Sequence, residues 1–130
     1  QLATIEPTGT PLGELPAVCT DALQYIQDTT YPDGTYVSVG QPIEKQWLVQ
    51  NSGDCDWNAD YSLKLIDGYP ALGAVSQIQL FPVPAGTQAT ISINFSAPYE
   101  AGTYQTAWQA YNAQGIPFGQ PIYMLIQVTP

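Results

Sequence analysis

Alternating apolar and polar residues predict that most of this chain forms short β-strands. Two runs alternate most clearly, with inward faces formed by Ile43, Lys45, Trp47 and Val49 in one and by Ala89, Ile91, Ile93 and Phe95 in the other. A period of two is typical of a strand that buries one face and exposes the other. Lys45 is the exception on its face, and we expect its aliphatic stem to pass Trp47 so that the ammonium group reaches solvent.

Shorter or weaker runs predict further strands at residues 36–38, 61–66, 74–81, 103–111 and 118–128, and residues 22–28 fit either a strand or one helical turn. Turn signals such as Pro32-Asp33-Gly34-Thr35 separate the runs at intervals of about 8–12 residues. Such spacing, without helices between strands, predicts an all-β fold: an antiparallel β-sandwich of about seven strands, with a barrel as the second choice.

The chain has 130 residues, which is the size of one domain. Residues 1–17, QLATIEPTGTPLGELPA, show neither a strand nor a helix period and are rich in Pro, Gly and Thr. We interpret them as a linker that leads into a domain over residues 18–130, and the whole as a segment of a larger protein.

Charge narrows the range of functions. The chain has eleven acidic residues and only two basic ones, Lys45 and Lys64. Arg and His are absent, and the net charge is −9. A surface of this sign repels phosphate backbones and anionic lipids, so we expect no nucleic-acid partner. The longest apolar stretches are too short for a bilayer, so we expect no membrane insertion by this segment.

The chemistry of common active sites is missing. Without His, the chain has no Ser-His-Asp or Cys-His nucleophile and no His-ligated metal. The glycines are spaced as turns and the acids cluster in turns, so neither a phosphate loop nor a buried carboxylate pair stands out. We therefore predict no enzyme and no cofactor.

Two cysteines, Cys19 and Cys55, are either free thiols or one disulfide. Both have acidic neighbours, as in Asp54-Cys55-Asp56, which indicates accessible loop positions and favours the disulfide. A bond closing this loop would stabilise the fold by roughly 3–4 kcal/mol and would indicate an oxidising compartment.

The segment around Cys55 also resembles the start of a calcium loop, with oxygen ligands at alternate positions: Asp54, Asp56, Asn58 and Asp60. Ala59 stands where such a loop requires Gly, and Leu65 stands where it requires a carboxylate. An acidic turn beside a disulfide is therefore the simpler interpretation.

The order of the tryptophans and glycines is similar to that of a known family. The series Lys45-x-Trp47-x-x-x-Asn51-x-Gly53-x-x-x-Trp57, followed by Ala97-Pro98, Gly102-Thr103-Tyr104, Trp108 and Phe118-Gly119, resembles the four-tryptophan (FW) domain. That domain is the immunoglobulin-like module of the next-to-breast-cancer-gene autophagy receptor. The resemblance covers about residues 19–128, and Tyr123 replaces the fourth tryptophan.

The resemblance implies an immunoglobulin-like sandwich that acts as a protein-interaction module without catalytic activity. The cysteine pair behind a Thr/Pro-rich segment is similar to the form of this domain in secreted bacterial proteins, so we expect a secreted or cell-surface protein. Tyr104 is expected to form a tyrosine corner, although an ordinary strand tyrosine is the alternative.

Two other functions remain open, a carbohydrate-binding module and a structural spacer. The candidate binding residues are tyrosines near predicted turns, because aromatic rings there can stack on sugars or anchor a protein partner: Tyr31, Tyr36, Tyr69, Tyr99 and Tyr111. Trp47 and Trp108 are predicted to lie in the core, and Trp57 either in the core or over the edge of the sandwich.

Overall fold

A computed structural model describes residues 18–68 and 71–130, so the predicted linker at residues 1–17 lies outside the described residues. The described chain contains eight strands and one short 3-10 turn, η1 (Ala71–Gly73). The strands are β2 (Gln24–Asp28), β3 (Thr35–Ser38), β4 (Pro42–Gln50), β5 (Ser62–Asp67), β6 (Gln77–Gln79), β7 (Gln88–Ser96), β8 (Gly102–Tyr111) and β9 (Pro117–Thr129).

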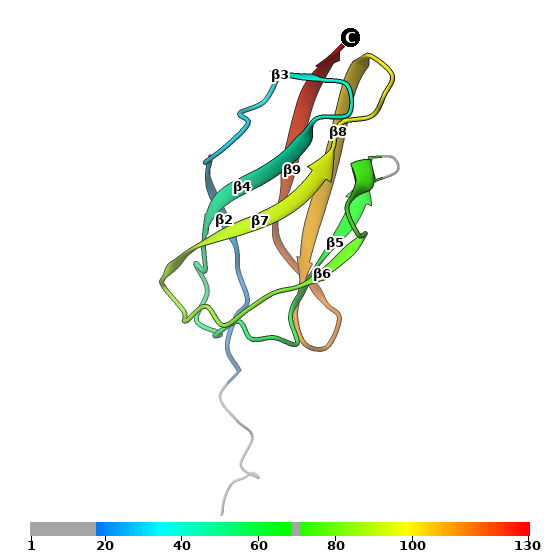
Figure 1. Cartoon of the computed structure of the whole chain (residues 1–130). Helices are drawn as coiled ribbons and strands as arrows, with labels where there is room; N and C mark the ends of the chain where they lie inside the picture. Colours follow the sequence, from blue (N-terminus) through cyan, green and yellow to red (C-terminus); the bar gives the residue numbers. More distant parts are fainter. Residues whose placement is uncertain (1–17, 69–70) are drawn as a thin grey trace, which may run out of the picture.

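The strands form two sheets that pack face to face, which confirms the predicted sandwich (Figure 1). One sheet has the order β2-β4-β7 and the other has the order β3-β9-β8-β5-β6. All strand pairs are antiparallel except β3 with β9, which runs parallel. Between β2 and β3 the chain crosses from one sheet to the other.

The core is formed by the faces that the alternation predicted. The odd-numbered residues of β4 from Ile43 to Val49 are buried, and so are Ile91, Ile93 and Phe95 of β7. Trp47, Trp57 and Trp108 are all buried, so Trp57 belongs to the core and does not merely cover an edge. Phe95 and Trp108 make an edge-to-face contact between the two sheets, with ring centroids 5.9 Å apart.

Two stretches differ from simple alternation. The predicted strand at 74–81 is reduced to the three residues of β6. In β8 the pairing register shifts between Trp108 and Ala110, and the consecutive residues Ala107 and Trp108 are both buried. Such an irregularity places extra side chains inside the sandwich, which a period of two does not predict.

Cys19 and Cys55 form a disulfide, with Cα atoms 5.0 Å apart. The expectation that both cysteines are accessible is wrong for Cys55, which is only 5% exposed. The bond closes a loop that contains β2, β3 and β4, and it joins the segment before β2 to the turn after β4.

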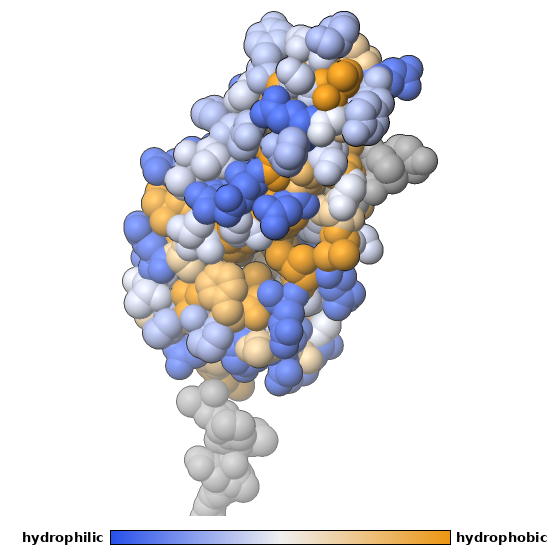
Figure 2. Space-filling model, in the orientation of Figure 1, coloured by the Kyte–Doolittle hydropathy of each residue, from blue (hydrophilic) through white to orange (hydrophobic). Residues whose placement is uncertain are grey.

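Tyr104 forms the predicted tyrosine corner, because its hydroxyl donates to the carbonyl of Glu100 over 2.8 Å. In the described part of the chain, no helix is long and apolar enough to cross a membrane. Polar side chains are interspersed with apolar ones on the face seen in Figure 2, and the apolar ones do not form one continuous surface there.

Candidate binding cleft

A cleft lies where β2, an edge strand of the three-stranded sheet, meets β9 of the other sheet. Its volume is about 360 Å³, and its lining residues are Tyr25, Asp28, Asp33, Gln120, Pro121, Ile122 and Tyr123. The backbone N–H of Tyr25 donates to the side-chain oxygen of Gln120 over 3.1 Å, which joins the two walls. The cleft is therefore formed by segments nearly a hundred residues apart in the sequence.

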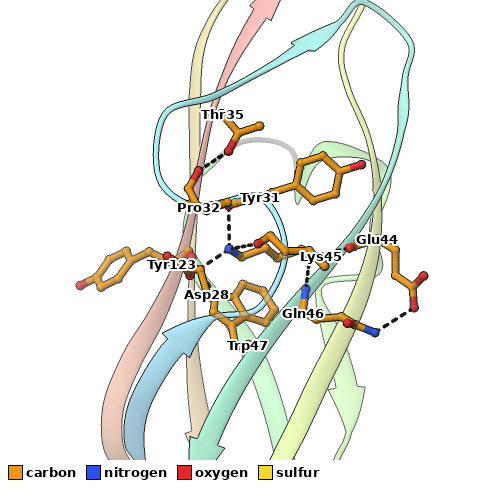
Figure 3. Close-up of polar contacts among 10 residues, drawn as sticks. Asp28, Tyr31, Pro32, Thr35, Glu44, Lys45, Gln46, Trp47 and Tyr123 are labelled. Carbon is orange, nitrogen blue, oxygen red and sulfur yellow. Dashed lines mark hydrogen bonds and ion pairs between the residues drawn. The ribbon is translucent and has the colours of Figure 1, made fainter.

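Lys45 does not line the cleft, but it lies behind it and binds Asp28, which does (Figure 3). Its side chain has no solvent exposure, so the expectation that its ammonium reaches solvent is wrong. The Nζ atom donates to Asp28 Oδ1 and to the carbonyl oxygens of Thr30 and Tyr31, each over 2.8 Å. All three ammonium donors therefore have partners, as a buried charge requires.

Trp47 lies two residues after Lys45 in β4 and binds the backbone of β9, the strand on the other side of the cleft. Its Nε1–H donates to the carbonyl of Tyr123 in β9 over 2.7 Å (Figure 3). Lys45 Nζ lies 5.5 Å from the centroid of the Trp47 ring, within range of a cation–π contact. Alternate residues of a strand point to the same side, so one β4 face fixes both the β2–β3 loop and β9.

Two tyrosines and two carboxylates are among the residues that line the cleft. Tyr25 is 38% exposed and Tyr123 is 44% exposed, whereas the Asp28 side chain is only 14% exposed. Burial, and then a hydrogen bond to Asp28, raise the pKa of Tyr25. Lys45 pairs with Asp28, and the exposed carboxylate of Asp33 also lines the cleft, so the three groups together carry one net negative charge, which suits an ammonium or guanidinium ligand.

Asn51 and Gly53 organise the turn after β4. Asn51 is buried, and its amide donates to the carbonyls of Cys55 and Val83 over 2.8 and 2.9 Å while its Oδ1 accepts from the N–H of Gly53. A Cβ on Gly53 would lie 2.1 Å from the carbonyl oxygen of Thr20. These two residues therefore pack the N-terminal segment against the turn.

Gly119 has a related role at the start of β9. Its φ of +78° favours glycine, and a Cβ there would lie 2.6 Å from Cβ of Leu23. This close approach lets β9 run beside the segment that leads into β2, directly before Gln120 and Pro121 enter the cleft wall.

Trp57 and Phe118 belong to an aromatic cluster at the end of the sandwich near the disulfide. Phe118 lies 6.0 Å from Trp57 and 5.7 Å from Tyr61 between ring centroids. The Tyr61 hydroxyl donates to Asp21, and burial followed by this bond raises the pKa of Tyr61 to about 12. Trp57 Nε1 is buried without a hydrogen-bond partner among the described residues.

The acidic turn does not converge on a cation. Asp54 accepts from the N–H of Thr20, Asp56 from Ala85, and Asn58 from Asp60. Within the described residues no group of three or more His, Cys, Asp or Glu is arranged to hold a metal. The oxygens bind backbone donors, so the weak calcium candidate at Asp54, Asp56, Asn58 and Asp60 is better explained as turn capping.

The predicted surface tyrosines are dispersed. Tyr36 and Tyr99 are largely exposed, whereas Tyr31 is half-buried and packs against the core. Tyr99 lies in the turn before β8 and Tyr111 is the last residue of that strand, and Lys64 Nζ lies 4.5 Å from the Tyr111 ring. Tyr69 lies outside the described residues. None of the described four makes an aromatic contact with another of them, so the described residues give no support to a sugar-binding platform.

Tyr25, Asp28, Asp33 and Gln120 line the cleft but were not predicted as site residues. One signal could have found part of this set, because a lysine on the inward face of a strand requires a buried carboxylate partner.

The family model described as "Ig-like domain from next to BRCA1 gene" matches residues 30–128. The chain belongs to this family. Lys45, Trp47 and Tyr123, which support or line the cleft, therefore lie inside the matched region of this Ig-like domain.

Relatives come from vertebrates and plants. The Next to BRCA1 gene 1 protein of Pongo abelii is 30% identical over 98% of this chain and 14% of its own length. Protein ILRUN of Danio rerio is 26% identical over 88% of this chain and 40% of its own, and Protein NBR1 homolog of Arabidopsis thaliana is 30% identical over 81% and 15%. The chain thus spans less than half of each.

A solved structure of a β-glucosidase from Listeria innocua aligns with 92% of this chain and 17% of its own. Its TM-score of 0.49 and sequence identity of 11% are too low to bear on function.

Proposed function

We propose that this Ig-like domain is a non-catalytic protein-interaction module whose β2–β9 cleft takes a cationic side chain from an extended segment of a partner protein. The observation that carries the proposal is the pairing of Asp28 and Asp33 with two exposed tyrosine rings in one cleft. A cation there gains both an ion pair and a cation–π contact.

The hydrogen bonds made by Lys45 and Trp47 behind the cleft support this role. Lys45 and Trp47 hold the two walls through hydrogen bonds of 2.7–2.8 Å, so a ligand does not have to order them. A surface ion pair contributes about 0.2–1 kcal/mol and an exposed cation–π contact about 0.5–1 kcal/mol. One cation alone therefore binds weakly, and affinity requires neighbouring contacts from the same segment.

The disulfide supports a role in an oxidising compartment, because such bonds persist in secreted and cell-surface proteins. We propose a secreted or surface-displayed domain, of bacterial origin as the cysteine pair behind the Thr/Pro-rich segment suggests. A structural spacer is the alternative that a lack of any ligand would favour.

The test is a titration of the domain with a short extended peptide that carries one central Lys, and with the same peptide carrying Gln there, followed by NMR amide shifts. We expect shifts at Tyr25, Asp33 and Tyr123 with the Lys peptide and at least threefold weaker binding with the Gln peptide. Equal binding of both peptides, or shifts elsewhere only, would overturn the proposal.

A matched pair of variants separates the cleft from general charge attraction. Asp33→Asn and Asp67→Asn each remove one exposed carboxylate, but only Asp33 lines the cleft. We expect about threefold to tenfold weaker binding of the Lys peptide for Asp33→Asn and no change for Asp67→Asn. Equal losses would indicate non-specific attraction to the acidic protein.

A further inference from the structure

Strand β7 forms the outer edge of the three-stranded sheet and has β4 on one side only (Figure 1). It is nine residues long and contains neither Pro nor a charged residue. Proteins usually protect edge strands with Lys, Pro, bulges or short length. No charged residue occurs anywhere in the segment 68–99, although Glu44 of the neighbouring strand β4 accepts from the Ser92 hydroxyl of β7 over 3.2 Å.

The register shows which backbone groups of β7 point outward. Two hydrogen bonds continue the β4–β7 ladder just beyond the ends of β4. The N–H of Ala97 donates to the carbonyl of Gln41, and the N–H of Asn51 donates to the carbonyl of Thr87. Hydrogen-bonded pairs alternate along an antiparallel ladder, so the odd-numbered residues of β7 bond to β4. The outward positions, with their N–H and C=O directed away from β4, are Gln88, Thr90, Ser92 and Asn94.

These four residues have no other backbone partner within residues 18–68 and 71–130. Beyond them the edge closes, because η1 contacts β7 and Gly73 lies against Ser96. The free stretch is therefore bounded, from Gln88 to Asn94, with polar side chains on the outer face and buried Ile91 and Ile93 on the inner face.

We propose that β7 pairs antiparallel with β7 of a second copy of this chain. In the register that uses all four outward positions, Ile91 lies on the twofold axis. Thr90 then pairs with the partner's Ser92, and Gln88 pairs with the partner's Asn94. Every pair is uncharged, so two chains of net charge −9 approach through a strand that sets no carboxylates opposite each other.

This pairing joins two three-stranded sheets into one continuous sheet. The contact is small, and interfaces below ~1,200 Å² give weak association. We expect a dimer with a dissociation constant on the order of 100 µM in 0.5 M NaCl. Salt favours the dimer because it screens the repulsion between the two acidic chains.

Analytical ultracentrifugation of the 130-residue chain at increasing concentration tests the pairing. Thr90→Pro removes an outward N–H that β4 does not use, and proline is tolerated at such edge positions. We expect it to weaken the dimer at least tenfold while the monomer stays folded. A chain that remains monomeric at ~1 mM in 0.5 M NaCl overturns the proposal.

Two further measurements test the pairing even if the proline variant folds poorly. Thr90→Lys brings two introduced ammonium groups close together across the axis and should weaken the dimer at least tenfold. Gln105→Lys adds the same charge to an exposed position of the inner strand β8 and should not weaken it. Hydrogen exchange should slow at Gln88, Thr90, Ser92 and Asn94 as concentration rises; unchanged exchange there overturns the β7 assignment.

Discussion

The three-stranded sheet has two edges that differ in almost every respect. The β2 edge closes against β9 through the Tyr25–Gln120 bond and carries acids and tyrosines above a buried lysine. The β7 edge is uncharged and leaves four backbone positions without partners among the described residues. If both proposals hold, one sheet recognises side chains at one edge and backbone at the other.

The largest expected effect is a loss of stability when Lys45, the buried lysine beside β2, is replaced. Lys45→Met leaves Asp28 and the carbonyls of Thr30 and Tyr31 without their buried partner, which costs roughly 3–5 kcal/mol of unfolding free energy. Urea denaturation measures this. Lys64→Met is the control, because the Lys64 ammonium lies over the Tyr111 ring and makes no ion pair within the described residues, so its loss should cost less than about 1 kcal/mol. Equal losses would show that Lys45 is not a structural centre.

Removing the disulfide should give the next largest loss of stability, and we expect this loss to be greater near β2 than near β7. Replacing Cys19 and Cys55 by Ala should lower the unfolding free energy by about 3–4 kcal/mol, because the bond closes a loop that contains β2. Hydrogen exchange should speed up more in β2 than in β7. Equal acceleration in both strands would show that the bond stabilises the sheet uniformly.

Alternation predicted the inward faces of β4 and β7 because a strand with one buried face keeps a period of two. The irregularity near Trp108 and the parallel pairing of β3 were not predicted, since both depend on the partner strand. The cleft was missed for the same reason. Asp28 is 17 residues from Lys45, and Gln120 reaches Tyr25 only after the sheets pack.

Tyr61 permits a pH test of the segment that leads into β2. Burial and the bond to Asp21 raise the pKa of Tyr61 to about 12, so the folded state holds this proton more tightly than the unfolded chain does. Its contribution to stability is full below pH 10 and is lost as pH rises toward 12. The pKa of Tyr25 is raised as well, so absorbance titration should show more than one late tyrosine, and Asp21→Asn should bring only the ionisation of Tyr61 to lower pH. An unchanged titration would exclude the Asp21 contact.

The smallest effect separates the two edges most directly, because salt should act on them with opposite sign. Binding of the Lys peptide at the cleft joins opposite charges, so raising NaCl from 50 to 500 mM should weaken it by about threefold or more. Pairing through β7 brings together chains of net charge −9, so the same change should strengthen it by a similar factor. Asp33→Asn should reduce the salt dependence of peptide binding and leave that of self-association nearly unchanged, because Asp33 lines only the cleft. If both processes weakened with salt, β7 pairing would depend on charge contacts that an uncharged strand cannot supply.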